Sequence, residues 1–403
     1  MKYDFTTVYD RRGMDALAVD ALGQPGGFAP GKPKDGFSVI PMWVADMNFA
    51  TVPTIPAAIM ERAQHPLYGY FSTPDAYYQA IIDWQRDRNG VTDLPKEAIG
   101  YENGVLGGVM SALGCLAAPG DAVLVHSPTY IGFTKSIEAA GYRIVHSPLK
   151  LDDQGIWRMD FEDMEHKLEQ NHIHAAVFCS PHNPCGRVWE RDEIERAMDI
   201  YRQHDCVVIS DEIWSDIIRP GHKHIPTQSV SEDARMRTVA LYAPSKTFNL
   251  AGLVGSYHII YNETLRDRVC AVSNKTHYNE MNVLSMHALI GAYQPQGYEW
   301  VDELNEVLAT NIDYFCDYVD EHFEGVTYAR PQGTYMVFLD CTEWCRERGR
   351  DIQWLLDEGA RVGVGYQDGR PFHGPCHIRV NLALPLSRVQ EACERLDRYV
   401  FNA

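Results

Sequence analysis

The sequence predicts an α/β protein with a mostly parallel sheet, because short apolar strands alternate with helical segments along the middle of the chain. From residue 121 onward, a hydrophobic period of two residues alternates with one of about 3.6 residues. The segments with the shorter period are the predicted strands 122–126, 143–147, 175–179, 207–210, 238–242 and 256–260. Strands separated by helices are typical of parallel sheets, in which ligands bind beyond the carboxyl ends of the strands.

The composition is that of an ordinary globular enzyme. The chain has 403 residues, of which 45% are hydrophobic and 23% charged, and its net charge of −19 argues against a nucleic-acid partner. No run approaches the roughly 20 apolar residues of a membrane span, and the charged start MKYDFTTVYDRRG does not resemble a signal peptide. We therefore expect no membrane association and a cytoplasmic location.

Cysteine usage favours a reducing compartment over a metal site or a disulfide framework. The ten cysteines are scattered, and no histidine cluster accompanies the closest pair, Cys341 and Cys345, at zinc-site spacing. We expect reduced thiols and no metal.

Three parts are predicted along the chain. Residues 1–45 form an N-terminal arm, rich in glycine and proline between Gly23 and Gly36, which joins a small domain. Residues 46–287 form a large cofactor-binding domain, and residues 288–403 form the rest of the small domain. The last part contains a long helix at 299–323, a turn and strand at 330–339, a strand at 377–382 and a helix from Ser387.

Lys246 is the candidate catalytic residue. It follows the buried strand 238–242 on a tight turn, within the segment YAPSKTFNLAGLVGS of residues 242–256. Most lysines are solvated surface charges. A partly desolvated lysine amine, however, can form a Schiff base with an aldehyde cofactor.

Polar residues also follow other predicted strands. Asp211 comes directly after the apolar run CVVIS and needs a cation or several donors at such a position. Asn183 projects from a turn fixed by prolines and a glycine in SPHNPCG, residues 180–186. Val105 and Leu106 begin a predicted helix after Gly104, where free backbone N–H groups suit a phosphate.

These motifs together resemble the fold-type I pyridoxal-phosphate enzymes, the superfamily that includes the class I/II aminotransferases. The resemblance covers nearly the whole chain, from WVADM at Trp43 to HIRVN at His377. WVADM, SPHNPCG and SKTFNLAGL are most similar to the cystathionine β-lyase-like (C–S lyase) branch. The resemblance implies a large domain with a mostly parallel sheet, a smaller α/β domain built from both chain ends, and a homodimer.

The resemblance also implies a role for each candidate residue toward pyridoxal 5′-phosphate and an amino-acid substrate. Lys246 would carry the cofactor, Asp211 would pair with the pyridine nitrogen, and Asn183 would donate to the ring oxygen. The remaining implied roles are ring stacking by Tyr130, phosphate binding by Val105, Leu106 and Ser245, phosphate binding across the dimer by Tyr70, and substrate-carboxylate binding by Arg379 and the backbone at Ala45. Tyr68 is the alternative to Tyr70, and Cys185 has no assigned role.

Two positions depart from the usual pattern. Trp214 stands three residues after Asp211, where related enzymes carry a tyrosine or histidine near the ring oxygen. Val254 stands eight residues after Lys246, where aminotransferases usually carry a phosphate-binding arginine that the C–S lyase branch commonly lacks. An indole N–H could replace the usual donor, or the ring could only pack.

The implied activity is cleavage of cystathionine or related S-substituted L-cysteines to a thiol, pyruvate and ammonia, with Lys246 as the general base. The alternative on the same scaffold is an aminotransferase acting between an L-amino acid and a 2-oxo acid. A second alternative is a protein that binds the cofactor or a partner for regulation. Retention of Lys246, Asp211, Asn183 and Arg379 together argues against that second alternative.

Overall fold

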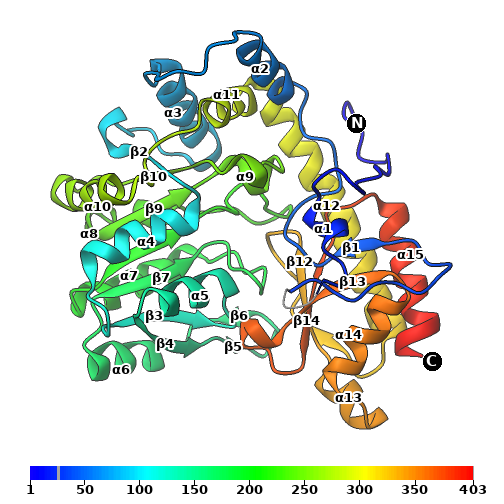
Figure 1. Cartoon of the computed structure of the whole chain (residues 1–403). Coiled ribbons are helices and arrows are strands. Elements are labelled where there is room, and N and C mark those ends of the chain that lie inside the picture. Colours follow the sequence, from blue (N-terminus) through cyan, green and yellow to red (C-terminus); the bar gives the residue numbers. More distant parts are fainter. Residues whose placement is uncertain (25–27, 403) are drawn as a thin grey trace.

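The computed structural model describes residues 1–24 and 28–402 and contains two sheets in two lobes (Figure 1). The larger sheet has seven strands in the spatial order β2, β10, β9, β8, β7, β3, β4. The five strands from β4 to β9 in this order are parallel to one another, whereas β10 is antiparallel to both β9 and β2. The strand bounds are β2 Ile99–Glu102, β3 Ala122–Ser127, β4 Arg143–Pro148, β7 Ala175–Cys179, β8 Val207–Asp211, β9 Thr238–Tyr242 and β10 Ser256–Ile259.

The central strands are buried on both faces. Strands β3, β7 and β9 are buried at every residue, which explains why their sequences are mostly apolar instead of alternating. A short hairpin, β5 Lys150–Leu151 with β6 Trp157–Arg158, lies outside the main sheet. The helices of this lobe are α2 Thr54–Ala63, α3 Asp75–Asn89, α4 Val105–Leu116, α5 Ile131–Ala139, α6 Phe161–Asn171, α7 Arg191–Gln203, α8 Glu232–Arg237, α9 Pro244–Thr247, α10 Glu263–Thr276 and α11 Val283–Ala292.

The smaller sheet combines the two ends of the chain. Its strand order is β1, β13, β14, β12, β11, with β1 supplied by the N-terminal arm and paired in parallel with β13. Its strands are β1 Ile40–Met42, β11 Thr327–Tyr328, β12 Met336–Asp340, β13 Val364–Asp368 and β14 His377–Asn381. The accompanying helices are α1 Leu17–Asp20, α13 Thr342–Arg348, α14 Ile352–Arg361 and α15 Leu386–Leu396. The smaller α/β domain from both chain ends is therefore confirmed.

Helix α12, Pro295–His322, joins the two hydrophobic cores. Its first half, including Trp300 and Leu304, packs in the large-lobe core, and its second half, including Phe315, packs against the small sheet. The predicted domain division at residue 287/288 stays a prediction, because this helix contributes to both cores.

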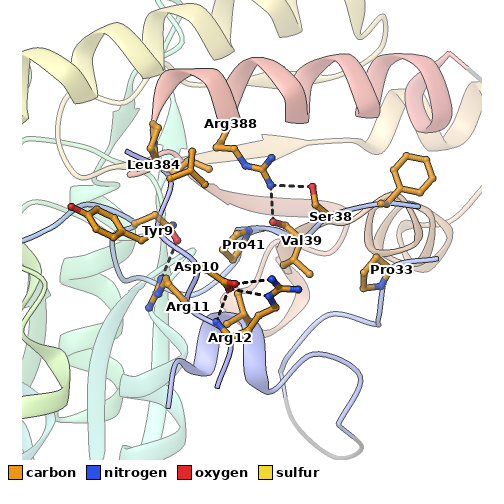
Figure 2. Close-up of a pocket in the computed structure, with 15 residues that line it drawn as sticks. Tyr9, Asp10, Arg11, Arg12, Pro33, Ser38, Val39, Pro41, Leu384 and Arg388 are labelled. Atoms are coloured by element: carbon orange, nitrogen blue, oxygen red, sulfur yellow. Dashed lines mark hydrogen bonds and ion pairs between the residues drawn. The ribbon is translucent and has the colours of Figure 1, made fainter. Parts of the chain in front are cut away.

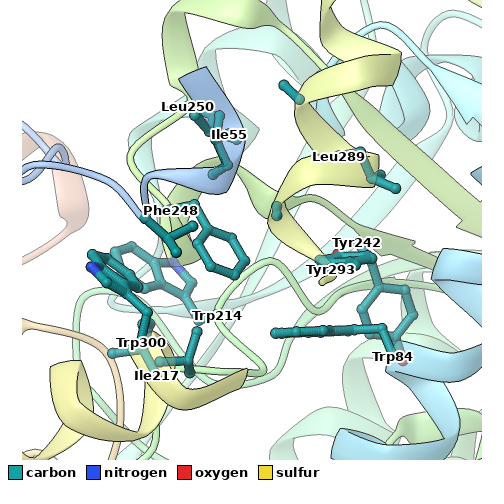
Figure 3. Packing of buried hydrophobic residues seen from close by; sticks show 14 of the residues in the cluster. Ile55, Trp84, Trp214, Ile217, Tyr242, Phe248, Leu250, Leu289, Tyr293 and Trp300 are labelled. Atoms are coloured by element: carbon teal, nitrogen blue, oxygen red, sulfur yellow. The ribbon is translucent and has the colours of Figure 1, made fainter. Parts of the chain in front are cut away.

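The hydrophobic core of the large lobe includes Phe248, which follows Lys246 by two residues. Phe248 stacks on Trp300 with ring centroids 5.5 Å apart, and Trp84 stacks on Tyr293 at 4.3 Å. Figure 3 shows Phe248 among Trp214, Trp300 and Leu250. Since Phe248 is two residues after Lys246, this packing fixes the backbone that carries the lysine.

The α/β fold and the six predicted strands are confirmed, with bounds that differ by one residue at most. Strand β2 is an addition that sequence periodicity did not reveal, because it is four residues long and pairs only with β10. The predicted helix 299–323 begins earlier, at Pro295, where proline suits the first turn. Within residues 1–24 and 28–402, no helix is both long enough and apolar enough to cross a membrane.

Candidate active site

Lys246 lies in α9, the short helix that follows β9. Its side chain is half-buried, and its Nζ donates to the carbonyl oxygen of Ala45 at 2.7 Å. Burial lowers the pKa of Lys246 to about 8, helped by the nearby Arg379 and opposed by Asp46 and Asp211. The neutral amine is therefore accessible close to neutral pH, as a nucleophile or general base requires.

The loop of residues 43–47 is held from several sides through its carbonyl groups. Besides the bond from Lys246, Asn381 Nδ2 donates to the carbonyls of Val44 at 2.7 Å and Asp46 at 2.6 Å. Asn249 Nδ2 donates to Met47 at 2.9 Å, and the Met47 N–H donates back to Asn249 Oδ1 at 3.0 Å. These bonds join the loop to both lobes and place Ala45 beside the lysine amine.

The N-terminal arm supports the same loop from the other side. Arg11 Nη2 lies 2.6 Å from Asp46 Oδ2, and Arg11 Nη1 donates to Asn48 Oδ1 at 3.1 Å. A cavity of about 510 Å³ is lined by the arm and by Leu384, Pro385 and Arg388, and Arg388 of α15 donates to the carbonyl of Val39 at 2.8 Å (Figure 2). The arm therefore holds Asp46 and is itself bonded to α15.

Asp211 is the last residue of β8 and is 4% exposed. Its Oδ1 accepts from the backbone N–H of Ile213 at 3.1 Å, and Asp211 forms no ion pair with an arginine or lysine in the described part of the chain. Burial raises the pKa of Asp211 to about 7. A buried carboxylate without a cation is costly unless a bound group supplies the positive charge.

Arg379 and Asn183 form a buried pair behind the lysine. Arg379 Nη1 donates to Asn183 Oδ1 at 3.0 Å, and Nη2 donates to the carbonyl of Trp43 at 3.2 Å. The guanidinium also lies over the ring of Phe372, 4.5 Å from its centroid. Asn183 is thus oriented with its oxygen toward Arg379, which leaves its amide donor for another partner.

The guanidinium of Arg379 has no anionic partner among the residues that the structure describes. It is 3% exposed, its Nε has no hydrogen-bond partner, and burial lowers its pKa to about 10. A buried guanidinium with a free donor fits a planar carboxylate, which it can bind through two parallel hydrogen bonds.

The start of helix α4 has the features expected of an anion site. Gly104, the residue before the helix, has φ +77°, and no acidic residue lies in the first turn. Val105 and Leu106 therefore present backbone N–H groups that lack acceptors within the helix. Ser245 lines the same cavity.

Tyr130 occupies the position before helix α5 and is half-buried. Its ring packs edge-on against Phe133, with centroids 5.3 Å apart. A Cβ on Gly132 would lie 2.3 Å from a carbon of the Tyr130 ring, so the absence of a side chain there determines where the ring can lie.

One cavity of about 200 Å³ lies among these residues, and Arg379 is next to it through its bond to Asn183. It is lined by Ala45, Gly104, Val105, Leu106, Tyr130, Asn183, Asp211, Ile213, Trp214, Ser245, Lys246, Ala251, Val254 and Gly255. The cavity is lined by the acid Asp211, the amine of Lys246 and the free N–H groups at the start of α4. These groups fit a phosphorylated pyridine aldehyde.

The two departures from the usual pattern both lie in this cavity wall. Trp214 is 1% exposed and packs edge-on against Tyr335 at 4.7 Å, and Lys246 Nζ lies 5.7 Å from the centroid of its ring. Val254 has φ +46°, an unusual value for a β-branched residue, and its carbonyl accepts from Tyr101 at 2.8 Å. Trp214 therefore supplies an apolar wall at the lysine.

Tyr70 does not line the cavity that contains Lys246 in the same chain. It is fully exposed in the segment between α2 and α3, and its hydroxyl has no hydrogen-bond partner in the described residues. Tyr68 differs, because its hydroxyl donates to the carbonyl of Ala63 at 3.0 Å. The cross-subunit role of Tyr70 stays a prediction.

The family model described as aminotransferase class I and II matches residues 39–396. The chain belongs to this aminotransferase class I and II family. Cystathionine beta-lyase PatB of Bacillus subtilis is 32% identical over 360 residues, covering 89% of this chain and 91% of that protein.

Solved structures of the same family share the whole architecture. A PLP-bound putative aminotransferase from Clostridium difficile is similar with a TM-score of 0.90 at 30% identity, covering 99% of this chain and 100% of that one. A PLP-bound C–S lyase from Staphylococcus hominis is similar with a TM-score of 0.88 at 28% identity, covering 100% of this chain and 99% of that one. The expected fold-type I architecture and the C–S lyase-like branch of the family are thus confirmed.

Sequence reasoning missed residues that position the site without lining it. Asn381 and Asn249 hold the loop 43–47, yet they lie far from it in sequence. Asn249 has φ +58°, a conformation that asparagine tolerates better than most residues. The R-x-N pattern at 379–381 was a signal for Asn381, but only the fold shows what its amide binds.

Proposed function

We propose that this protein is a pyridoxal-phosphate-dependent carbon–sulfur β-lyase that cleaves cystathionine or related S-substituted L-cysteines to a thiol, pyruvate and ammonia. The observation that carries the proposal is one cavity lined by a partly desolvated Lys246 and a buried Asp211 without a cation, together with a buried Arg379 without an anion, which is bonded to the lining residue Asn183. Each unpaired charge matches a group that the cofactor or an amino acid would bring.

The cofactor would be held by the residues described above. Lys246 would bind its aldehyde carbon, Asp211 its ring nitrogen, Asn183 its ring oxygen, and the start of α4 with Ser245 its phosphate. When bound, pyridoxal 5′-phosphate supplies an electron sink that makes the substrate Cα–H acidic. Pairing with the ring nitrogen would also offset the cost of burying the Asp211 charge.

Arg379 would fix the substrate through its α-carboxylate. Its free Nε and its Nη2 could donate side by side to the two carboxylate oxygens, while Nη1 keeps Asn183 in place. This clasp would direct the Cα proton toward Lys246, since both groups contact the loop 43–47.

Lys246 would then act as the base. With an amino-acid substrate held by the cofactor, the Lys246 Nζ would be available to accept the Cα proton, and its lowered pKa favours the neutral form that can do so. Loss of the thiolate from Cβ would follow.

An aminotransferase is the second candidate, because the solved structure from Clostridium difficile is described as a putative aminotransferase. The curated relative described as a cystathionine beta-lyase favours the lyase. Trp214 and Val254 agree with that choice, since an aminotransferase would usually carry a hydrogen-bonding side chain and an arginine at these positions.

We also propose a homodimer in the cytoplasm. The exposed apolar segment Leu67, Tyr68, Tyr70 and Phe71 supports an additional copy of the chain as the partner. The scattered cysteine usage supports a reducing compartment.

The proposal is tested with purified protein and a panel of sulfur amino acids. We expect a yellow protein in which borohydride reduction fixes the cofactor on Lys246, and release of equal amounts of pyruvate and thiol from cystathionine or an S-alkylcysteine. Lys246→Ala should abolish both results. Mapping of the adduct to another lysine, or no adduct at all, would overturn the assignment of Lys246.

A further inference from the structure

Two buried acids lie beside Asp211 without lining the cofactor cavity. The segment 211–216, DEIWSD, carries Glu212 and Asp216, which are 0% and 5% exposed. Asp211 and Trp214 of the same segment line the cavity, whereas these two acids do not. Burying a carboxylate costs free energy unless hydrogen bonds compensate it, so the partners of each acid indicate what it holds in place.

Glu212 is bonded to the end of strand β9, four residues before Lys246. Its Oε2 accepts from the hydroxyl of Tyr242 at 2.5 Å and lies 2.8 Å from His224 Nε2. Its Oε1 accepts from the backbone N–H of Thr227 at 3.0 Å. Burial acts to raise the pKa of Glu212, but these hydrogen bonds, led by that from His224, outweigh it and lower that pKa. Glu212 is therefore an ionised acceptor at neutral pH, which strengthens its bond from Tyr242.

Asp216 is bonded to Thr247, the residue that directly follows Lys246. Its Oδ2 accepts from Thr247 Oγ1 at 2.8 Å, and its Oδ1 accepts from Trp84 Nε1 at 3.1 Å. Trp84 belongs to the large-lobe core (Figure 3), so Asp216 also joins Thr247 to this core. Burial raises the pKa of Asp216, opposed by Arg88 at 3.9 Å and by the two donors. Removing the Thr247 hydroxyl would leave a buried carboxylate oxygen without its donor.

The two acids hold residues 243–250, the lysine turn, at two points. Tyr242 ends β9 directly before this turn, and Thr247 lies within it, next to Lys246. Both bonds come from the segment that begins with Asp211. The backbone that carries the lysine is therefore tied to the backbone that carries the acid of the cofactor cavity.

We propose that Glu212 and Asp216 are positioning residues, which hold the lysine turn in register with Asp211. Only the Lys246 side chain then has to move as its amine turns from the cofactor to the substrate Cα, so the reacting groups stay aligned. This role rests on the proposed function of Lys246 as cofactor carrier and base. It applies to elimination and amino transfer alike, because both remove the Cα proton.

The test removes one hydroxyl group from the holoenzyme. Thr247→Val deletes the donor to Asp216 at nearly equal volume, whereas Thr247→Ser keeps it. Thr238→Val is the matched control, because Thr238 is also fully buried and lies at the other end of β9, where its Oγ1 donates to the carbonyl of Ala234 at 2.7 Å.

Two readouts separate positioning from stability. The first is the rate at which the Cα proton of cystathionine is removed, followed as exchange with deuterated water and as pyruvate release, with KM measured alongside. The second is amide hydrogen exchange of Phe248 and Leu250, whose N–H groups donate within the turn to the carbonyls of Pro244 and Ser245, each at 2.9 Å. Proton exchange without pyruvate release in the wild type would overturn the proposed lyase alone, since the exchange needs no leaving group.

Thr247→Val should lower the rate of proton removal about tenfold at a KM within about twofold, and speed exchange of both amides about tenfold. Thr247→Ser should restore both values, and Thr238→Val should leave them nearly unchanged. If Thr247→Val does not fold, Tyr242→Phe, which removes the donor to Glu212, decides by the same readouts. Wild-type values in the folded variant, or equal changes in Thr238→Val, would refute the positioning role.

Discussion

Arg379 shows how a single buried charge identifies a ligand class. Among the described residues its guanidinium contacts an amide oxygen, a backbone carbonyl and an aromatic face, none of which neutralises it. Arg187 provides the contrast, because it is equally buried but forms an ion pair with Glu193. An arginine already paired stabilises the fold, whereas an unpaired one is available to bind an anion.

Arg379→Lys should raise KM for the amino acid much more than it weakens cofactor binding. A bidentate clasp becomes a single point charge, and losing a charge-assisted hydrogen bond costs about 1.5–3 kcal/mol, or roughly 10- to 150-fold in KM. Steady-state kinetics and cofactor titration measure the two effects. Arg187→Lys is the control and should lower stability with KM unchanged. Weaker cofactor binding at a constant KM would make Arg379 structural.

The stability of the cofactor-free protein should carry the pH signature of Asp211. Because burial raises its pKa from 3.8 to about 7, the folded state binds more protons than the unfolded state between these values. Unfolding free energy should therefore fall as pH rises from about 4 to about 7, relative to Asp211→Asn, which lacks this titration. Denaturant unfolding across this pH range measures the difference. An equal pH dependence of the unfolding free energy in the wild type and in Asp211→Asn would show that burial does not destabilise the charged form of Asp211.

At the scale of elements, the loop 43–47 depends on strand β14 and the turn after α9. Asn381, at the end of β14, donates to two carbonyls of this loop. Asn249, in the turn after α9, donates to the carbonyl of Met47. Movement of the small sheet would therefore move the substrate-facing backbone together with Arg379, which lies on the same strand.

Asn381→Ala should raise KM and lower the unfolding free energy by about 1–3 kcal/mol, because it leaves the carbonyls of Val44 and Asp46 unpaired. Asn311→Ala is the matched control, since Asn311 is another buried amide that donates to two carbonyls, those of Leu382 and Leu384, away from the cavity. The control should lose similar stability at nearly unchanged KM. A similar rise in KM in both variants would refute the positioning role of Asn381.

At the scale of the whole molecule, one chain supplies every candidate site residue except Tyr70. The exposed position of Tyr70 requires a second copy if it is to reach a cofactor phosphate. Mixing inactive Lys246→Ala chains with inactive Tyr70→Ala chains should restore activity. In each hybrid dimer, one of the two sites then has both Lys246 and Tyr70 intact, so about half of the sites in the hybrids should be active. Activity of the mixture and verified subunit exchange are the measurements. Exchange without recovery would disprove the cross-subunit role.

The sequence was informative where local pattern determines structure. The buried strands of the large sheet are apolar runs between helices, and Lys246, Asp211 and Asn183 follow three of them, so their convergence at one edge could be predicted. The positioning role of Asn381 and the two-core role of α12 could not be predicted. Each depends on contacts between segments far apart in the sequence, and the residue types alone do not indicate which segments will meet.

The partition between elimination and amino transfer tests the central claim most directly. Cystathionine is mixed with the holoenzyme under single-turnover conditions, and thiol, pyruvate and the amine form of the cofactor are measured together. We expect equal amounts of thiol and pyruvate, with the cofactor remaining in its aldehyde form. Rapid, stoichiometric conversion of the cofactor to its amine form without release of thiol would contradict the lyase and establish the aminotransferase.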